Sequence, residues 1–271
     1  MNDKSDKSLD ILGVKPIASS IEKSVDGTFA GASAFLSRIC LPAAEEFGLM
    51  AKDTVAGWRA ANAARIAARA EERLRQQHGD SADELTGNTR VVCAAIQNGS
   101  WIDDPVVQDF WAGLLAASCD SDGRNDSNIV FVSVLSQLST GQVRLLKYAA
   151  ENAEKYRDSK GWPHAKELSI EMADLKELFQ TGDVHLIDVS LDHLRTMELI
   201  GTGVVAGDGG GIISGTNTAK ILPSPLALNL YVRGEGCARD VIQYWDLQPL
   251  PEEQNTNEPN AENKIADPEN A

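Results

Sequence analysis

The sequence lacks a long apolar segment. Its longest uncharged run near the N-terminus, GTFAGASAFLS, begins at Gly27 and stops before Arg38. Because a membrane-spanning helix needs about 20 apolar residues, we expect no transmembrane helix. The first ten residues, MNDKSDKSLD, mix acids with lysines and lead into no apolar stretch with a cleavage site, so no secretion signal is expected. Together these features favour a cytoplasmic location.

Cysteine is scarce, and its spacing is uninformative. The chain of 271 residues has four cysteines and no C-x-x-C pair, which disfavours a zinc site, a redox motif and a disulfide framework. We interpret Cys40, Cys93, Cys119 and Cys237 as small apolar residues. Since no Gly-x-Ser-x-Gly or Cys/His signature accompanies them, we predict no catalytic residue, no metal site and no cofactor, and the chain is not expected to be an enzyme.

Basic residues are outnumbered. The chain has 25 Lys and Arg against 40 Asp and Glu, a formal net charge of −15. Such a molecule repels phosphate backbones and acidic membranes unless a local patch reverses the field, so nucleic acid is an unlikely partner. We predict a protein partner or self-association, and peripheral membrane contact stays open. The apolar-poor segment 249–271 is interpreted as a disordered acidic tail, and residues 1–16 as a flexible N-terminus.

Helix-forming residues dominate the first third of the chain. Between Ile17 and Gln77 the sequence is rich in alanine, with turns expected at Pro42 and at several glycines. From Ala56 onward the pattern predicts one long helix whose apolar side chains share a face. These are Ala63, Ile66, Ala67, Ala70 and Leu74.

A second face of this long helix carries Arg65, Arg69 and Arg73, spaced i, i+4 and i+8. We expect their face to be exposed. The row is either a solvated helix face or a docking stripe for an anionic partner such as nucleic acid or lipid headgroups. These three arginines are the candidate partner-binding residues of the chain.

Local capping signals mark the helices that follow. Asp104 and Pro105 are typical of an N-cap and the first helical position, and Ser139 with Gln142 predicts a capping box. We expect a helix over Asn128–Leu138. The acidic turn before it, CDSDGRNDSN, does not fit a calcium loop, because that loop requires glycine at its sixth position and this sequence has Asn125 there.

The stretch from Val91 to Ala149 resembles the Abi-alpha, or abortive infection alpha, family of bacterial proteins. The motifs that carry the resemblance are the WAGLLAAS helix, the acidic turn after it, and the apolar segment ending in LSQLSTGQVRLL. The resemblance extends from about Pro42 to Ile200. It implies a role in abortive phage infection, in which an infected bacterium arrests or dies before the phage spreads. It brings no catalytic residue, and the turn CDSDGRND departs from the His-Pro that often follows this helix in relatives.

The C-terminal part predicts a different module. We expect Ser169 to cap a helix ending at Gly182 and a second helix over Val184–Leu199, followed by the glycine-rich stretch IGTGVVAGDGGGIISG. Because no strand precedes Gly-x-Gly-x-x-Ala and no helix can start at GDGGG, a dinucleotide loop is disfavoured. We predict a hairpin wing with strands near Gly203–Ala206 and Ile212–Ser214.

The sequence therefore predicts a mainly α protein, with a helical domain over 17–138 and a winged-helix-like module over 139–248. The second helix of that module is net negative and includes His185, Asp188 and Asp192, which we interpret as surface or core residues rather than metal ligands. The favoured function is phage defence through partner contacts. The alternatives are a DNA-binding regulator that uses the wing and a membrane-surface effector that uses the arginine-rich helix.

Overall fold

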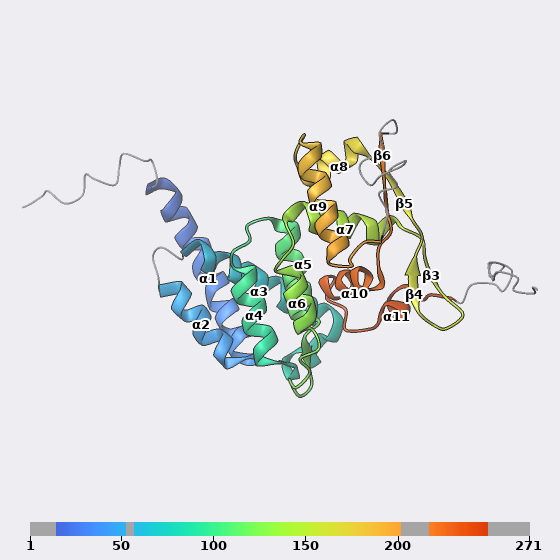
Figure 1. Cartoon of the computed structure of the whole chain (residues 1–271). Coiled ribbons are helices and arrows are strands. Elements are labelled where there is room, and N and C mark those ends of the chain that lie inside the picture. The colour runs from blue at the N-terminus through green and yellow to red at the C-terminus, as the bar shows by residue number, and fades with distance from the viewer. Residues whose placement is uncertain (1–14, 53–56, 202–216, 249–271) are drawn as a thin grey trace, which may run out of the picture.

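The computed structural model describes residues 15–52, 57–201 and 217–248 (Figure 1). These residues are mostly helical, and their strands form only small two-stranded antiparallel sheets. The prediction of a mainly α protein is confirmed. Within the described ranges, no helix combines the length and the apolar content needed to cross a membrane.

Helix α3 is the centre of the N-terminal half. It lies against α1 and α2 on one side and against α4 and α5 on the other. The bounds of these helices are α1 Lys15–Ile39, α2 Leu41–Lys52, α3 Gly57–His78, α4 Thr89–Gly99 and α5 Pro105–Ala116. The predicted apolar face of α3 is buried from Ala63 to Leu74. Its alanines carry little bulk, which lets the neighbouring helices approach closely.

The segment between α3 and α4 forms two short elements. The 3-10 helix η2, Gly79–Glu84, is followed by strand β1, Thr86–Gly87, which pairs with β2, Cys119–Asp120. Ala82 is fully buried, and the Arg38 guanidinium donates a hydrogen bond to its carbonyl oxygen. The segment is therefore held by contacts from α1, which lies about 40 residues earlier in the chain.

The caps predicted at Asp104 and Ser139 are confirmed. The Asp104 carboxylate accepts hydrogen bonds from the N–H groups of Val106 and Val107 at 3.0 and 3.1 Å, and Pro105 is the first residue of α5. Ser139 and Gln142 form the capping box of α7, Thr140–Asn152. The segment after the acidic turn is helical as predicted, and forms α6, Ile129–Leu135.

The C-terminal part corrects one capping prediction. Ser169 does not cap a helix but lies in strand β5, Leu168–Glu171, opposite Lys220 of β6, Thr218–Ile221. Helix α8, Met172–Phe179, begins after this strand, and Gln180 in the left-handed conformation ends it before Gly182. The strand was missed because its partner lies 50 residues further along the chain, so no local pattern marks it.

The remaining elements follow the same chain order as the predicted module. Helix α9 is Val184–Thr196, and strands β3, Lys155–Arg157, and β4, Pro163–Ala165, form a hairpin after α7. The predicted wing strands fall within residues 202–216, which lie outside the described residues. The winged-helix interpretation therefore stays a prediction.

Helix α10, Pro225–Gly234, joins the two parts of the molecule. It packs against α5 and α7, so the predicted boundary at residue 138 is crossed by direct helix contacts. Ser224 caps α10, and Pro225 is its first residue. After it, the short helix α11, Val241–Trp245, folds back so that the Trp245 ring stacks on Tyr231 with centroids 5.6 Å apart.

Candidate partner-binding groove

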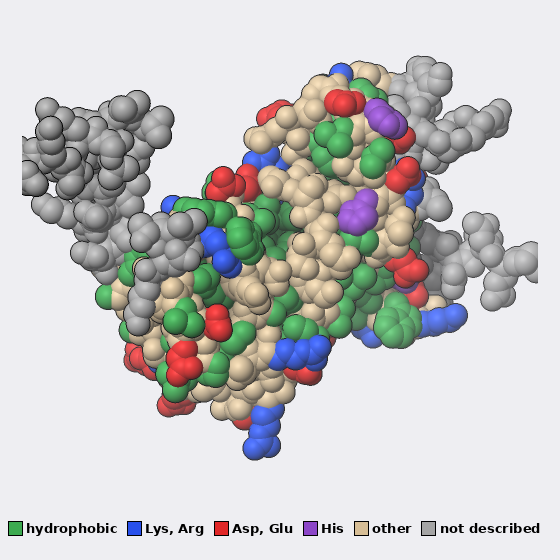
Figure 2. Space-filling model, turned by 60° about the vertical axis from the view of Figure 1, so that its left-hand side comes forward, with side chains coloured by type: hydrophobic (Ala, Val, Ile, Leu, Met, Phe, Trp, Pro, Cys, Tyr) green, Lys and Arg blue, Asp and Glu red, His purple; other side chains and the backbone are tan. Residues whose placement is uncertain are grey.

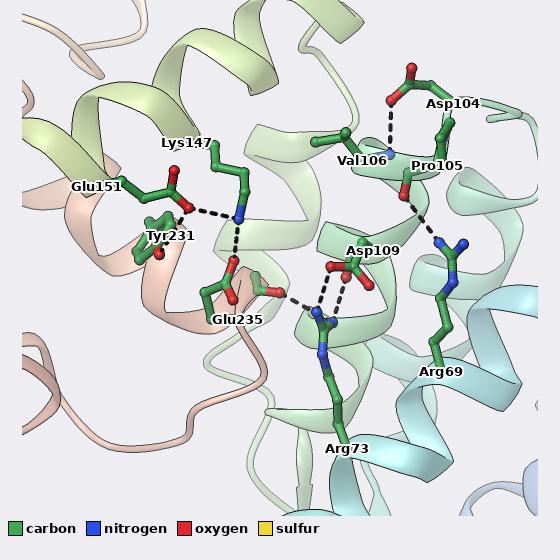
Figure 3. A network of polar contacts seen from close by, with 11 residues as sticks. Arg69, Arg73, Asp104, Pro105, Val106, Asp109, Lys147, Glu151, Tyr231 and Glu235 are labelled. Atoms are coloured by element: carbon green, nitrogen blue, oxygen red, sulfur yellow. Dashed lines mark hydrogen bonds and ion pairs between the residues drawn. The ribbon is translucent and has the colours of Figure 1, made fainter.

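The three candidate arginines do not share one environment. Arg65 is exposed and donates a hydrogen bond to the Asn62 side-chain oxygen at 2.6 Å. Arg69 is half-buried and donates to the backbone oxygen of Pro105 at 3.0 Å, which Figure 3 shows as a reach from α3 to the start of α5. The row thus begins at the surface and turns toward α5.

Arg73 corrects the expectation of a fully exposed stripe. Its side chain is 16% exposed and ion-pairs with the Asp109 carboxylate at 2.7 Å. It also donates to the backbone oxygens of Asp109 at 2.6 Å and Gly234 at 3.4 Å (Figure 3). Since residues spaced i+4 advance by about 40° around a helix with 3.6 residues per turn, a row of three rotates by about 80° and its last member faces α5. Arg73 is a structural bridge.

Arg65 and Arg69 line a groove between α1, α3 and the start of α5. We name it the α1–α3 groove, and its volume is about 1100 Å³. Its apolar walls include Phe29 and Trp58. Its polar lining consists of Thr28, Asn62, Arg65, Arg69, Asp103 and Gln108.

Two buried amides form the floor of this groove. Gln108 is 1% exposed and donates from its amide nitrogen to the Asn62 side-chain oxygen at 3.1 Å and to the Ile102 carbonyl at 2.8 Å. Asn62 in turn donates to the Ser100 carbonyl at 3.1 Å. The same Asn62 oxygen accepts from Arg65, so the floor fixes the position of that guanidinium.

The end of the groove carries an aromatic pair that the sequence reasoning missed. Trp58 is 49% exposed and Trp101 is 57% exposed, and their rings meet edge to face with centroids 5.7 Å apart. The Arg59 guanidinium lies over the Trp101 ring at 3.9 Å and donates to the Ser100 hydroxyl. The pair comes from positions 43 residues apart, so a search along one helix face does not detect it. The adjacent Trp58 and Arg59 at the start of the predicted helix were the available signal.

The charge on the groove arginines is not neutralised by neighbours. Among the described residues, no carboxylate lies within ion-pair distance of Arg59, Arg65 or Arg69, whereas Arg73 and Arg75 on the same helix each have one. Arg65 and Arg69 are instead held by neutral oxygens. In a chain of net charge −15, unneutralised arginines beside a groove form a local anion-attracting surface, since charges beyond about 8 Å are largely screened at physiological salt.

The surface around these residues mixes apolar and charged groups. Figure 2 turns the side formed by α1 and α2 toward the viewer and shows hydrophobic side chains exposed beside basic ones. Acidic side chains are spread over the same view rather than gathered at one point. The electrostatic attraction of the groove is therefore local and does not extend over a whole face.

Cys93 and Cys119 are poorly suited to nucleophilic chemistry. Burial raises the pKa of Cys119 to about 12, and burial together with the neighbouring Cys40 raises the pKa of Cys93 to about 11. Both thiols are thus neutral near pH 7, whereas a reactive cysteine needs a depressed pKa. Within the part of the chain that is described, no group of three or more His, Cys, Asp or Glu residues is arranged to hold a metal ion.

Comparisons with known proteins identify the family of this chain. Searches of curated proteins and of solved structures found no match. One family model, described as abortive infection alpha, matches residues 59–209, which is more than half of the chain and includes Arg65, Arg69 and Gln108. The match spans the long helix α3, the α5 helix with its acidic turn, and the helices up to α9. This chain therefore belongs to the abortive infection alpha family.

Proposed function

We propose that this protein defends a bacterial cell against phage by abortive infection, and that it acts in the cytoplasm by binding a partner rather than by catalysis. Family membership supports the defence role. The observation that carries the binding role is the pair Arg65 and Arg69, whose guanidinium groups line the α1–α3 groove without a carboxylate partner among the described residues. The partner that fits this groove carries negative charge.

A non-catalytic mode of action is supported by the chemistry of the candidate nucleophiles. Cys93 and Cys119 have raised pKa values, and neither thiol lines the α1–α3 groove. The Arg73 side chain is engaged in holding α3 to α5 and α10, so it is a structural residue rather than a group that contacts a partner.

A DNA-binding regulator is the weaker alternative. The second helix of the predicted module, α9, exposes Leu186 and Val189 together with Asp192. Its Arg195 is paired with Asp192. A recognition helix needs basic groups for phosphates and base edges, whereas this surface is apolar and acidic.

A membrane-surface effector is a second candidate function, and one observation favours it. Trp58 and Trp101 are both about half exposed and lie beside Arg59. Tryptophan and arginine together are typical of protein surfaces at the headgroup region of a bilayer. Binding to vesicles that contain anionic lipid, compared with neutral vesicles, tests this candidate.

Phage challenge of bacteria that express the protein tests the main proposal. Changing Arg65→Glu and Arg69→Glu together reverses the charge of the groove and should abolish protection, measured as the number of phage plaques. The matched control is Arg90→Glu with Arg124→Glu, which makes the same change in net charge at two exposed sites away from the groove. If the groove variant stays folded and protects as well as the parent, the groove is not the working surface.

A further inference from the structure

We infer that the α1–α3 groove binds a nucleotide, recognising its phosphates through Arg65 and Arg69 and its base through Trp58 and Gln108. The inference deepens the proposed function and rests on it for biological meaning, because it names the ligand of the same groove.

Two guanidinium groups provide the phosphate contacts. An arginine side chain has five N–H donors. Within the described residues, Arg65 donates one of its hydrogen bonds to Asn62, and Arg69 one to Pro105, both at neutral oxygens. These bonds orient the two groups and leave their positive charge and remaining donors available. Planar guanidinium groups held in this way are well suited to phosphate oxygens.

Residues four apart on one helix face lie about 6 Å apart at their Cβ atoms. Arg65 and Arg69 start one helical turn apart on α3 and line the same groove, so both side chains can reach the phosphates of one nucleotide. A third arginine at the next position of the row, Arg73, takes no part because Asp109 already neutralises it.

The groove also contains hydrogen-bond acceptors. The amide nitrogen of Gln108 is used within the protein, and its side-chain oxygen accepts no hydrogen bond from the described residues. The Asp103 carboxylate lies at the edge of the groove, exposed and without an ion-pair partner in the described ranges. These oxygens can accept from the N–H groups of a base, whereas an inorganic anion offers no such donors.

The aromatic wall provides a surface for stacking. Trp58 lines the groove and is about half exposed, and its contact with Trp101 supports the indole ring from the side. A flat base can lie on the free face of such a ring. The groove volume of about 1100 Å³ lies just above the usual range of about 300 to 1,000 Å³ for small-molecule sites, which leaves room for a nucleotide and its hydration.

Calorimetric titration of the full chain tests this inference. The probes are ADP, GDP, CDP and UDP. Pyrophosphate is included because it has the phosphates without a base, and a short single-stranded oligonucleotide because it presents phosphates and bases in a polymer. At least one nucleoside diphosphate or the oligonucleotide should bind with a Kd below about 1 mM. Pyrophosphate should bind more weakly than the best diphosphate.

Two variants assign the binding to the groove. Arg65→Gln with Arg69→Gln should weaken nucleotide binding at least about ten-fold, since both charge-assisted contacts are lost. The control Arg90→Gln with Arg124→Gln should leave it unchanged. Trp58→Ala should weaken nucleotide binding but not pyrophosphate binding, and it serves as an independent test if the double arginine variant does not fold.

The inference is overturned if no diphosphate and no oligonucleotide binds below about 1 mM, or if the groove variants bind as the parent does. Its failure is distinguishable from that of the proposed function. If the parent protein binds no nucleotide but a groove variant loses phage protection, only the nucleotide inference is overturned. Nucleotide binding in the groove with unchanged protection by the groove variants overturns the proposed function alone.

Discussion

Gly113 of α5 and Gly234 of α10 meet backbone to backbone. A Cβ atom placed on Gly113 would lie 1.6 Å from the Gly234 carbonyl oxygen, and one placed on Gly234 would lie 2.4 Å from the Phe110 ring. Around this crossing, Arg73 binds the Gly234 carbonyl from α3, and Lys147 of α7 pairs with Glu235 at 2.9 Å (Figure 3). Four helices from both halves of the chain thus meet at one point where only glycine fits.

Replacing Gly113 by alanine should destabilise the protein by about 3 kcal/mol, the upper end of the cost of overpacking, because the obstructing atoms belong to the backbone and cannot rotate away. Urea unfolding followed by circular dichroism measures the change. The matched control is Gly48→Ala in α2, where nothing lies within 4 Å of the added Cβ. That variant should gain about 0.5 to 1 kcal/mol from helix propensity. Equal stabilities for the two variants would contradict the close crossing.

Arg73 and Arg65 should differ in their effect on stability although they lie on one row of α3. Arg73→Gln removes the ion pair with Asp109 and weakens the bridge to Gly234. The free energy of unfolding should fall by about 1 to 2 kcal/mol. The loss is no larger because Asp109 is partly exposed, and solvent screens the ion pair. Arg65→Gln should change stability by no more than about 0.5 kcal/mol because its face is exposed. A reversed order in denaturant unfolding would mean that the bridge contributes nothing to the fold.

The Asp104 carboxylate both caps a helix and forms an ion pair. Removing it should therefore lower the free energy of unfolding by more than the removal of a simple cap does. Asp104 caps α5 and also pairs with Arg144 at 2.5 Å, with both side chains largely buried. Asp104→Ala should cost about 2 to 3 kcal/mol, since it removes a cap worth about 1 kcal/mol and leaves the arginine unpaired. Asp183→Ala, which removes the exposed cap of α9, should cost only about 1 kcal/mol. Equal losses in thermal or urea unfolding would show that the ion pair adds nothing.

The alkylation of Cys93 should depend steeply on pH. With a pKa of about 11, only about one thiol in a thousand is ionised at pH 8, whereas an ordinary thiol with a pKa near 8.5 is about one quarter ionised. Reaction with iodoacetamide in the folded protein should therefore be slow at pH 8 and rise about ten-fold per pH unit up to about pH 11. Peptide mass spectrometry after quenching measures it, with the urea-unfolded protein as the control. Equal rates in the folded and unfolded protein at pH 8 would contradict the raised pKa.

The module that contains α9 should not bind an operator. Its exposed surface combines Leu186 and Val189 with the acid Asp192, so phosphate backbones are repelled. In a gel-shift titration at ~100 mM salt, no sequence-specific complex should form, whereas operator binders typically reach about 10⁻⁸ M or better. Nanomolar binding that weakens steeply with added salt would favour the regulator instead.

Local features of the sequence were sufficient for helix α3 and for the caps at Asp104 and Ser139. The turns expected at glycines were wrong, because Gly27, Gly31 and Gly48 lie inside α1 and α2. The apolar face of α3, the cap at Asp104 and the capping box at Ser139 and Gln142 were all predicted from residues within a few positions of one another. They could be predicted because helix hydrogen bonds and caps involve neighbours three or four residues apart. The resemblance to the abortive infection alpha family was carried by motifs in the same segment, and the match of the family model confirms it.

Features that depend on distant parts of the chain were decided only by the tertiary structure. Ser169 lies in a strand because β6 pairs with it, and Arg73 is a bridge because the carbonyl oxygens of Asp109 in α5 and Gly234 in α10 both lie within hydrogen-bond distance of it. The groove itself needs α1, α3 and α5 together, and its aromatic end needs Trp58 and Trp101 from separate segments. The sequence by itself determined which segments become helices and which arginines share a row. Which of those arginines keeps an unneutralised charge was determined by the side chains that packing brings within a few ångströms of it.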